Sequence, residues 1–295
     1  MVPKLTSFVA LSALCVGSTV ANVQYGGINI AGFDFGIDTT GSGSASQAYP
    51  PLKAISGIDG VGQMQHFVTD DKFNAFRLPV GWQYLVNDQV GPIDPSNLAT
   101  YDQLVQGCLQ TGALCIIDIH NYARFNGGII GQGGPSNEQF ADFWGSLATK
   151  YASQDQVAFG LMNEPHDLNV DEWTQSVQAA VTAIRGAGAN NNMVLMPSTS
   201  YTSAATLVSS GCAASLNGVT NPDGSKTNLV FDVHRYFDGD GSGTSTDCVS
   251  ANIADFQSVA DFMHANNRQA FVTEIGGGST PSCIPIVSQV IDFLK

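Results

Sequence analysis

Charged side chains are scarce in this sequence of 295 residues: they make up 12% of it, and only 11 residues are lysine or arginine. The net charge of −14 at pH 7 would repel a polyanion, so we expect neither nucleic acid nor an anionic membrane surface as a partner. Apolar runs of 18 residues are absent, which argues against a membrane-spanning segment in the mature chain. HExxH motifs and zinc-like cysteine spacings are also missing, and we expect no metal and no cofactor. An uncharged substrate suits this composition.

The first 21 residues have the features of a secretory signal peptide. Lys4 supplies a positive start, residues 8–16 are mostly apolar, and Thr19 and Ala21 are small residues at the usual cleavage spacing. A short buried helix is the alternative interpretation. We expect cleavage after Ala21 and a secreted, extracellular protein.

The number of cysteines fits a protein with two disulfides. One of the six lies in the signal peptide, and the remaining five cannot all pair. Cys108 and Cys115 fall at a helix end and in the following strand, close enough to form a bridge. Cys248 and Cys283 each follow a late strand and could meet above it. Cys212 would then be the odd thiol.

Short apolar segments rich in Val, Ile, Leu and Phe recur along the chain, as the buried strands of a parallel sheet do. From residue 75 onwards their starts are 36 to 43 residues apart, and segments of helical periodicity such as 137–153 and 171–187 lie between them. A repeated β-then-α unit of about 40 residues is typical of a (β/α)8 barrel, the TIM-barrel fold. The seven expected strands are residues 25–30, 75–79, 114–120, 157–163, 193–197, 229–236 and 270–274.

A closed barrel of this class needs eight strands, and seven can be counted. Residues 285–295 have helical spacing and are expected to form the helix after the seventh strand, so an eighth strand would begin beyond Lys295. An open parallel edge is an aggregation hazard. We therefore expect residues 22–295 to form a single catalytic domain that lacks its eighth β/α unit and is truncated at the C-terminus.

Polar residues stand at the ends of these apolar strands, where barrel enzymes carry their catalytic groups. Glu164 is followed directly by Pro165, which turns the chain, and Glu274 is followed by Ile275 and three glycines that let a ligand approach the backbone. Two carboxyl groups in different environments suit a glycosidase in which one is the acid and the other the nucleophile. The residues expected at the barrel mouth are Arg77, His120, Asn163, Glu164, His234, Tyr236 and Glu274.

Two of these residues are expected to support the carboxyl groups. Arg77 is the natural partner to keep Glu274 ionised, and a purely structural ion pair is the alternative role. Asn163 could donate a hydrogen bond to the sugar 2-hydroxyl, a contact that strengthens in the transition state.

The run Asp238-Gly239-Asp240-Gly241 resembles the beginning of a calcium-binding loop. Val249 occupies the position where that motif needs a bidentate glutamate, and no flanking helices are indicated. The pattern therefore favours a mobile loop beside the cleft over an ion site.

Several longer runs resemble the fungal endoglucanases of glycoside hydrolase family 5, from about residue 23 to the end of the chain. They are NIAGFDFG, FRLPVGWQYLV, DIHNYARFNGGIIGQGGP, FGLMNEPHD, NPDGSKTNLVFDVHRY and NNRQAFVTE. The resemblance implies a (β/α)8 barrel, a retaining mechanism and a β-1,4-glucan as partner, and we expect a monomer. It also implies Glu164 as acid/base and Glu274 as nucleophile. The residues that it places around the scissile sugar are Arg77, His120, His234 and Tyr236.

The sequence departs from the family pattern at positions that affect sugar binding. Phe125 and Tyr201 stand where tryptophan is usual, so stacking on the sugar rings there is expected to be weaker or retuned. Ile275 replaces a usual threonine. A tryptophan that floors the cleft on the eighth strand of the family has no counterpart before Lys295.

Two alternatives remain open at this point. The same chemistry could act on another β-glycan, such as mannan, xyloglucan or mixed-linkage glucan, because the residues that line the cleft decide the substrate. The second alternative is an inactive, truncated glucan-binding remnant. The presence of both Glu164 and Glu274 argues against a chain that lost its activity long ago and has since accumulated substitutions.

Overall fold

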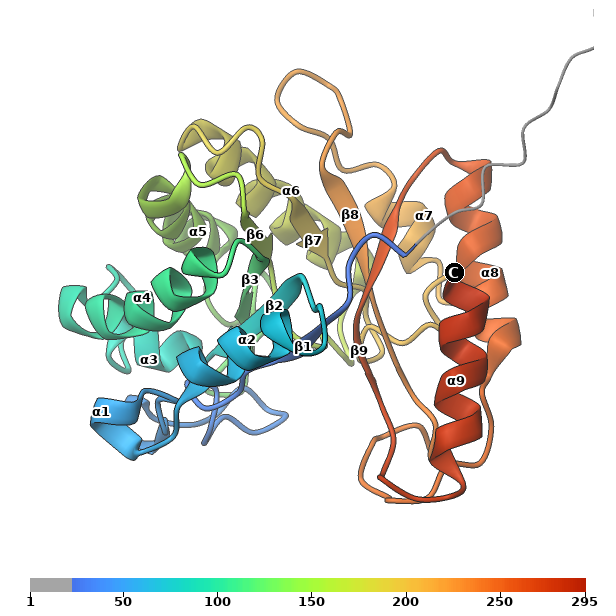
Figure 1. Ribbon diagram of the computed structural model, residues 1–295. Helices are drawn as coiled ribbons and strands as arrows, with labels where there is room; N and C mark the ends of the chain where they lie inside the picture. Colours follow the sequence, from blue (N-terminus) through green and yellow to red (C-terminus); the bar gives the residue numbers. More distant parts are fainter. Residues whose placement is uncertain (1–22) are drawn as a thin grey trace, which may run out of the picture.

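A parallel sheet curved into a nearly closed barrel forms the centre of the molecule (Figure 1). The computed structural model describes residues 23–295, so the expected signal peptide, residues 1–21, lies outside the described residues. In spatial order the sheet contains β1 (Gly27–Asn29), β2 (Ala75–Val80), β3 (Leu114–Ile119), β6 (Val157–Gly160), β7 (Val194–Met196), β8 (Leu229–Tyr236) and β9 (Ala270–Gly276). These strands fall within or overlap the seven expected segments, and the predicted barrel class is confirmed.

Each neighbouring pair of strands in this sheet is parallel, from β1 with β2 to β8 with β9. A chain that returns to begin a parallel neighbour must cross over one face of the sheet, and here the outer helices provide the crossovers. The carboxyl ends of all the strands therefore meet at one mouth. A small antiparallel hairpin, β4 (Arg124–Phe125) with β5 (Gly128–Ile129), follows β3.

The longer helices begin at side chains that cap free backbone N–H groups. Ser136 and Gln139 form a capping box at the start of α5, Asn169 caps α6, and Asp94 caps α4. Among residues 23–295, no helix has the length and apolar character that crossing a bilayer requires. The helices are α1 (Lys53–Ser56), α2 (Gly60–Thr69), α3 (Trp82–Val86), α4 (Pro95–Gln110), α5 (Asn137–Tyr151), α6 (Val170–Gly186), α7 (Cys212–Leu216), α8 (Ile253–Ala265) and α9 (Cys283–Leu294), with a short 3-10 turn at Ala45–Gln47.

Large apolar side chains fill the layer between the sheet and the helices. Trp144 on α5 and Trp173 on α6 are fully buried, and both pack against Phe140. A second, smaller cluster lies inside the barrel near the strand starts, and it consists of Ala75, Leu114, Ile116, Ala158, Leu195 and Val230. The barrel interior is thus packed below the mouth, as in other barrels of this class.

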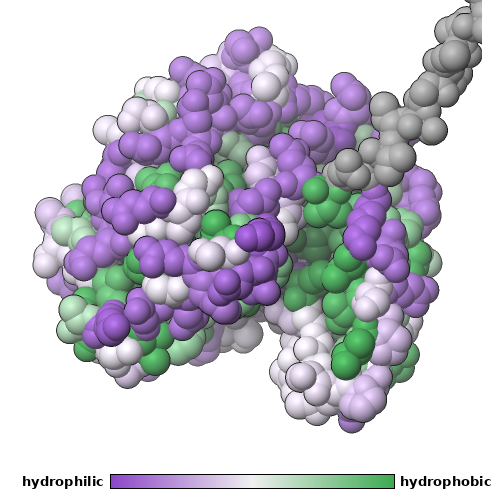
Figure 2. Space-filling view, in the orientation of Figure 1, coloured by the Kyte–Doolittle hydropathy of each residue, from purple (hydrophilic) through white to green (hydrophobic). Residues whose placement is uncertain are grey.

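The barrel is open between β1 and β9. Within the described chain, β1 pairs with β2 alone and β9 pairs with β8 alone. A groove of about 710 Å³ runs along the gap, and Ile28, Phe271, Ile291 and Leu294 are among the residues that line it. Figure 2 shows hydrophobic surface in the hollow between the β1 side of the barrel and α9. The two unpaired edges are those expected of a sheet with seven strands.

Both expected disulfides are present. Cys108–Cys115 joins the end of α4 to β3, and Cys248–Cys283 joins the segment after β8 to the beginning of α9. Cys212 is a buried free thiol. The pairing predicted from the sequence is confirmed.

Candidate active site

The seven polar residues expected at the barrel mouth come together there. Ion pairs and hydrogen bonds connect them, directly or through Asp118, into one network, in which the pair of His234 with Glu274 joins Glu164 to the rest. Arg77 comes from β2, His120 from the end of β3, Asn163 and Glu164 from the turn after β6, His234 and Tyr236 from β8, and Glu274 from β9. Neighbouring parallel strands that end at the same height explain why residues so far apart in sequence meet.

The backbone at Glu164 is held in an uncommon conformation. Its φ of 44° lies in the left-handed region, which costs a residue with a Cβ about 1–2 kcal/mol. Asn163 N donates to Ile119 O at 2.7 Å, and Pro165 O accepts from Tyr201 N at 2.9 Å, so the turn is fixed on both sides. Such locally strained conformations cluster at functional sites. Here the turn directs the Glu164 carboxylate toward His234, with which it bonds.

The Glu274 carboxylate has a donor on each oxygen. Arg77 Nη1 contacts Oε1, and the Tyr236 hydroxyl donates to Oε2 at 2.7 Å. Arg77 Nη2 reaches Asn163 Oδ1 at 2.7 Å and Asp118 Oδ2 at 3.0 Å. The guanidinium therefore ties together three strand ends, and the expected contact between Arg77 and Glu274 is found.

This environment keeps Glu274 ionised. Burial alone would raise its pKa, since only 11% of the side chain is exposed. The positive charges of His234, Arg77 and His120 and the hydrogen bond from Tyr236 outweigh burial and hold the pKa of Glu274 well below its usual range. The same carboxylate raises the pKa of Tyr236, because its negative charge disfavours a second anion, and burial acts in the same direction. Tyr236 is therefore a neutral donor to an ionised acceptor.

Glu164 has a different set of partners, and no arginine of residues 23–295 forms a hydrogen bond or ion pair with it. Its Oε1 lies 2.8 Å from His234 Nδ1, and His234 Nε2 lies 2.9 Å from Thr273 Oγ1. The Thr273 hydroxyl in turn donates to Asp232, which is buried under the mouth. Burial would lower the pKa of His234, but the carboxylates of Glu274, Glu164 and Asp232 raise it on balance.

Glu164 and Glu274 are close enough to act on the same atom of a ligand. One carboxylate oxygen of each, together with a ring nitrogen of His234, lies within 4.8 Å of the others. A separation near 5 Å lets one carboxyl attack a sugar carbon while the other protonates the departing oxygen. The same three residues also offer ligand atoms at a spacing that could hold a metal ion.

Two buried residues and one partly buried residue below the mouth belong to the site but were not expected from the sequence. Asp118 Oδ2 lies 2.9 Å from His120 Nδ1 and pairs with Arg77, while Asp232 and Thr273 support His234. Asp118 Oδ1 is a buried atom without a hydrogen-bond partner in the described part of the chain. Burial raises the pKa of Asp232, and the nearby His234 and Arg77 oppose the rise.

The two aromatic residues expected at the cleft lie in different surroundings. Tyr201 is 43% exposed, and its ring stacks on His166 with centroids 4.4 Å apart. Phe125 is 8% exposed and packs edge-to-face on Trp82. A sugar ring therefore has much more access to Tyr201 than to Phe125.

The loop after β8 is tied down by its own first aspartate. Asp238 accepts hydrogen bonds from Gly243 N at 3.0 Å and Ser245 N at 3.1 Å. Its carboxylate oxygens are thus used by the backbone of the loop.

A family model described as Cellulase (glycosyl hydrolase family 5) matches residues 37–295. Endoglucanase EG-II of Hypocrea jecorina is 55% identical over 283 residues, which cover 94% of this chain and 68% of that protein. A protein of Phanerodontia chrysosporium named "Manganese dependent endoglucanase Eg5A" is 43% identical over 92% of this chain and 68% of its own. The crystal structure of Cel5A (EG2) from Hypocrea jecorina superposes with a TM-score of 0.92 over 93% of this chain and 85% of that one. The chain therefore belongs to glycosyl hydrolase family 5 and is a glycoside hydrolase of the endoglucanase type.

Proposed function

We propose that this enzyme hydrolyses internal β-1,4 bonds of glucans with net retention, with Glu274 as nucleophile and Glu164 as acid/base. The separation of the two carboxylates carries the proposal. Oxygens within 4.8 Å fit the about 5–5.5 Å of retaining glycosidases and fall short of the about 6.5–9.5 Å that inverting enzymes need to admit a water molecule.

The different partners of the two carboxylates support this division of roles. Arg77 and Tyr236 keep Glu274 anionic, as a nucleophile requires. In the first step Glu274 attacks the anomeric carbon, the glycosidic bond breaks, and the proton of Glu164 passes to the leaving oxygen. In the second step Glu164 takes a proton from water, the water oxygen bonds to the anomeric carbon, and Glu274 leaves as a carboxylate.

His234 supports the change of protonation that Glu164 undergoes. Because Thr273 gives its proton to Asp232, its oxygen accepts from His234 Nε2, which places a proton on that nitrogen. The surrounding carboxylates raise the pKa of His234, so the protonated ring donates from Nδ1 to Glu164 Oε1, while the proton that passes to the leaving oxygen is carried by the other oxygen of Glu164. The imidazole thus holds the carboxyl in place in both halves of the cycle.

Neutral contacts rather than charges would hold the glucan. The exposed ring of Tyr201, backed by His166, offers an apolar face on which a pyranose can lie. The oxygen of Asn163 accepts from Arg77, and within residues 23–295 its side-chain N–H groups donate no hydrogen bond, so they can donate to the sugar 2-hydroxyl. Initial rates on cellulose, mannan, xyloglucan and mixed-linkage glucan separate this substrate from the alternatives, and a preference for mannan would overturn the glucan assignment.

We infer that catalysis requires no metal ion, although one relative is named as manganese dependent. Both oxygens of Glu274 already accept from Arg77 and Tyr236. A divalent cation between Glu164, His234 and Glu274 would lie against the guanidinium and would compete with substrate for the nucleophile.

We further propose that the protein is secreted as a monomer after cleavage of residues 1–21. The proposal rests on the composition of that segment and on the two disulfides, which persist in oxidising surroundings. N-terminal sequencing of protein from the culture medium should begin at Asn22. Retention in the cell, or a mature N-terminus at Met1, would contradict it.

The catalytic roles can be tested on the full natural polypeptide. Glu274→Gln should abolish turnover while leaving glucan binding largely intact. Glu164→Ala should slow glucan hydrolysis severely, and added azide should restore turnover of an activated aryl glycoside and give the β-glycosyl azide. The matched controls are Glu138→Gln on α5 and Glu172→Gln on α6, which change exposed glutamates that are not among the residues of the mouth network.

The anomeric form of the first product distinguishes the mechanisms. Proton NMR during hydrolysis should show the β-anomer first, followed by mutarotation. An α-configured product, an α-glycosyl azide, or a Glu274→Gln variant of near-normal rate would overturn the assignment. A wild-type protein that binds glucan and never cleaves it would instead support the non-catalytic alternative.

A further inference from the structure

We propose that residues 237–248, a loop anchored by the Cys248–Cys283 disulfide, act as a positioning device for Tyr236 and through it for Glu274. Gly243 is the point at which this anchored loop touches the ring. The inference rests on the proposed role of Glu274 and extends it, because it gives a catalytic purpose to a segment that does not itself reach the reacting atoms.

The Cδ1–Cε1 edge of the Tyr236 ring lies close to two glycines. A Cβ at Gly243 would lie 2.7 Å from the ring carbon Cδ1, and a Cβ at Gly276 would lie 3.0 Å from Cε1. Real Cβ atoms essentially never approach a carbon as closely as 2.7 Å, and 3.0 Å is tighter than most such contacts, so the ring needs glycine at 243 and is crowded by any side chain at 276. From this slot the hydroxyl reaches Glu274 Oε2 at 2.7 Å.

The glycines that follow the nucleophile also fit against the anchored loop. A Cβ at Gly277 would lie 2.5 Å from the sulfur of Cys248, and a Cβ at Gly278 would lie 2.2 Å from the carbonyl oxygen of Thr246. The backbone after Glu274 is therefore in direct contact with the anchored loop at two consecutive residues, Gly277 and Gly278.

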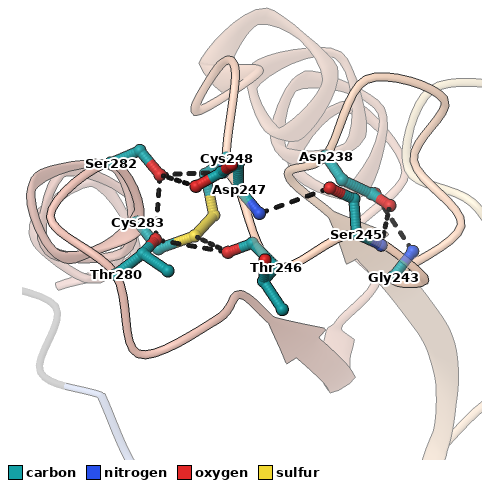
Figure 3. The surroundings of a disulfide bond; sticks show 9 residues. All are labelled: Asp238, Gly243, Ser245, Thr246, Asp247, Cys248, Thr280, Ser282 and Cys283. Atoms are coloured by element: carbon teal, nitrogen blue, oxygen red, sulfur yellow. Dashed lines mark hydrogen bonds between the residues drawn. A yellow bond between two sulfur atoms is a disulfide. The ribbon is translucent and has the colours of Figure 1, made fainter.

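Two sets of bonds hold the anchored loop in this place, as Figure 3 shows. At one end the Asp238 carboxylate gathers the backbone N–H groups of Gly243 and Ser245. At the other end the disulfide to Cys283 fixes the last residue of the loop, and Ser282 Oγ donates to Asp247 Oδ1 at 3.1 Å. The position of Gly243 is thus set by covalent and polar bonds at both ends of the segment.

Core packing does not hold the ring on this side. A hollow of about 330 Å³ is lined by Tyr236, the anchored loop and the glycine run. A ring released by the loop would have space to turn away from Glu274. The contact with Gly243 therefore decides whether the phenol keeps its hydrogen bond to the nucleophile.

The expected effect of losing that hydrogen bond appears in the pH–rate profile. A hydrogen bond to the ionised form lowers the pKa of Glu274, so its loss raises the pKa and moves the acid limb of kcat/KM to higher pH. A bond to a charged group corresponds to about a tenfold change or more in rate and to a shift of about one pH unit. KM should change little, because Tyr236 faces the carboxylate.

The test compares two glycines of the same loop in the full natural enzyme. Gly243→Ala should lower kcat about tenfold and shift the acid limb upwards. Gly239→Ala, where a Cβ meets nothing within 4 Å, controls for the added methyl group. Gly224→Ala controls for backbone strain, because its φ of +81° is close to the +75° of Gly243 and a Cβ there also meets nothing within 4 Å; both controls should leave kcat and the pH profile unchanged. Cys248→Ala with Cys283→Ala should act in the direction of Gly243→Ala, whereas Cys108→Ala with Cys115→Ala, at the strand starts, should not move the acid limb.

A double substitution separates positioning from general damage. Tyr236→Phe removes the hydroxyl, so adding Gly243→Ala to it should give no further shift of the acid limb. An equal further shift, or a Gly243→Ala enzyme with wild-type kcat and pH profile, would overturn the proposal. If Gly243→Ala fails to fold, the Cys248/Cys283 variant decides in the same way. A Glu274→Gln enzyme with a near-normal rate would instead overturn the proposed function itself.

Discussion

Arg77→Met removes a buried cation that contacts three other strand-end residues. The guanidinium bonds to Glu274, Asn163 and Asp118, and only 4% of the residue is exposed, so water cannot replace it. Methionine fills a similar length without charge. Glu274 and Asp118, which both pair with the guanidinium, then keep their negative charges without the cation that balanced them.

The size of the effect follows from the burial of the pair. Breaking a buried ion pair by removing one partner costs about 3–5 kcal/mol, because the remaining charge stays desolvated. Part of this appears as lost stability, which is a large share of a total of about 5–15 kcal/mol. If about 3 kcal/mol falls on the transition state, kcat/KM drops on the order of 10²-fold.

The pH dependence should change in a defined direction. The depressed pKa of Glu274 stabilises the wild-type fold above the pKa of this group in the unfolded chain, and the contribution is lost as pH falls through the lower folded value. Without Arg77 the folded pKa moves back toward its usual range. The stability contributed at neutral pH therefore shrinks, and the acid limb of kcat/KM moves to higher pH.

Thermal melts and pH–rate profiles on an aryl cellobioside measure both effects. Arg185→Met is the control, because Arg185 is also buried but bonds to Asn221 and to backbone carbonyls away from the mouth. It should lose stability without moving the acid limb. Arg77→Lys should show a loss of stability and a shift of the acid limb that lie between those of wild type and Arg77→Met, since a lysine keeps the charge but cannot reach three partners at once. An Arg77→Met enzyme whose kcat/KM is within tenfold of the wild-type value, and whose acid limb is not shifted, would refute the reasoning.

Four further outcomes are expected. Tyr201→Ala should raise KM for glucan about two- to tenfold with kcat unchanged, and an unchanged KM would exclude stacking on this ring. The rate should be bell-shaped in pH with an acidic optimum, and a rate that climbs through pH 8 would contradict a glutamic acid donor. Dialysis against EDTA should leave the rate unchanged, and strict recovery by Mn²⁺ would contradict the metal-free mechanism. Residues 22–295 expressed alone should bind a hydrophobic dye and associate through the groove between β1 and β9, less so after Phe271→Lys, whereas a sharp, monomeric, dye-free melt would refute this.

The sequence was most informative at the strand ends. Apolar segments that stop at a polar residue predicted both the strands and the residues that meet at the mouth, because parallel strands in a barrel end at one face. Glu164 before a proline and Glu274 before a glycine run stood out for the same reason. The cysteine pairs also followed from their places after a helix and after late strands.

Predicting the buried aspartates Asp118 and Asp232 from the sequence requires one further inference from strand geometry. Asp118-Ile119-His120 and Asp232-Val233-His234 are the same D-x-H pattern on two strands. Residues two apart on a strand share a face, so each aspartate had to lie beneath its histidine, and this signal was available. Thr273 could not be identified in this way, because strand alternation places it on the face opposite Glu274, and only the register shift between β8 and β9 at Val233/His234 lets its hydroxyl reach His234 and Asp232.

The contacts of the loop after β8 could not be predicted. The pattern of Asp238 and its glycines indicated a mobile loop, yet Asp238 bonds to the backbone of its own loop. The reason that Gly243 is glycine depends on Tyr236, and the reason that Gly277 is glycine depends on the disulfide sulfurs. Such close approaches between segments arise only after the strands have set their relative heights, and no periodicity records them.

The Cys248–Cys283 bridge also has a mechanical consequence. It closes a covalent ring between two cysteines that are 35 positions apart in sequence, and this ring contains α8 and β9. A fully extended segment of this length would span about 120 Å, at about 3.3–3.6 Å per residue. When the chain is pulled from its two ends, the rest of the chain unfolds and extends, but the segment inside the disulfide ring cannot be extended. The strand that carries the nucleophile therefore bears no tension along its own backbone, and reducing this bond alone lengthens the contour of the molecule by about that amount.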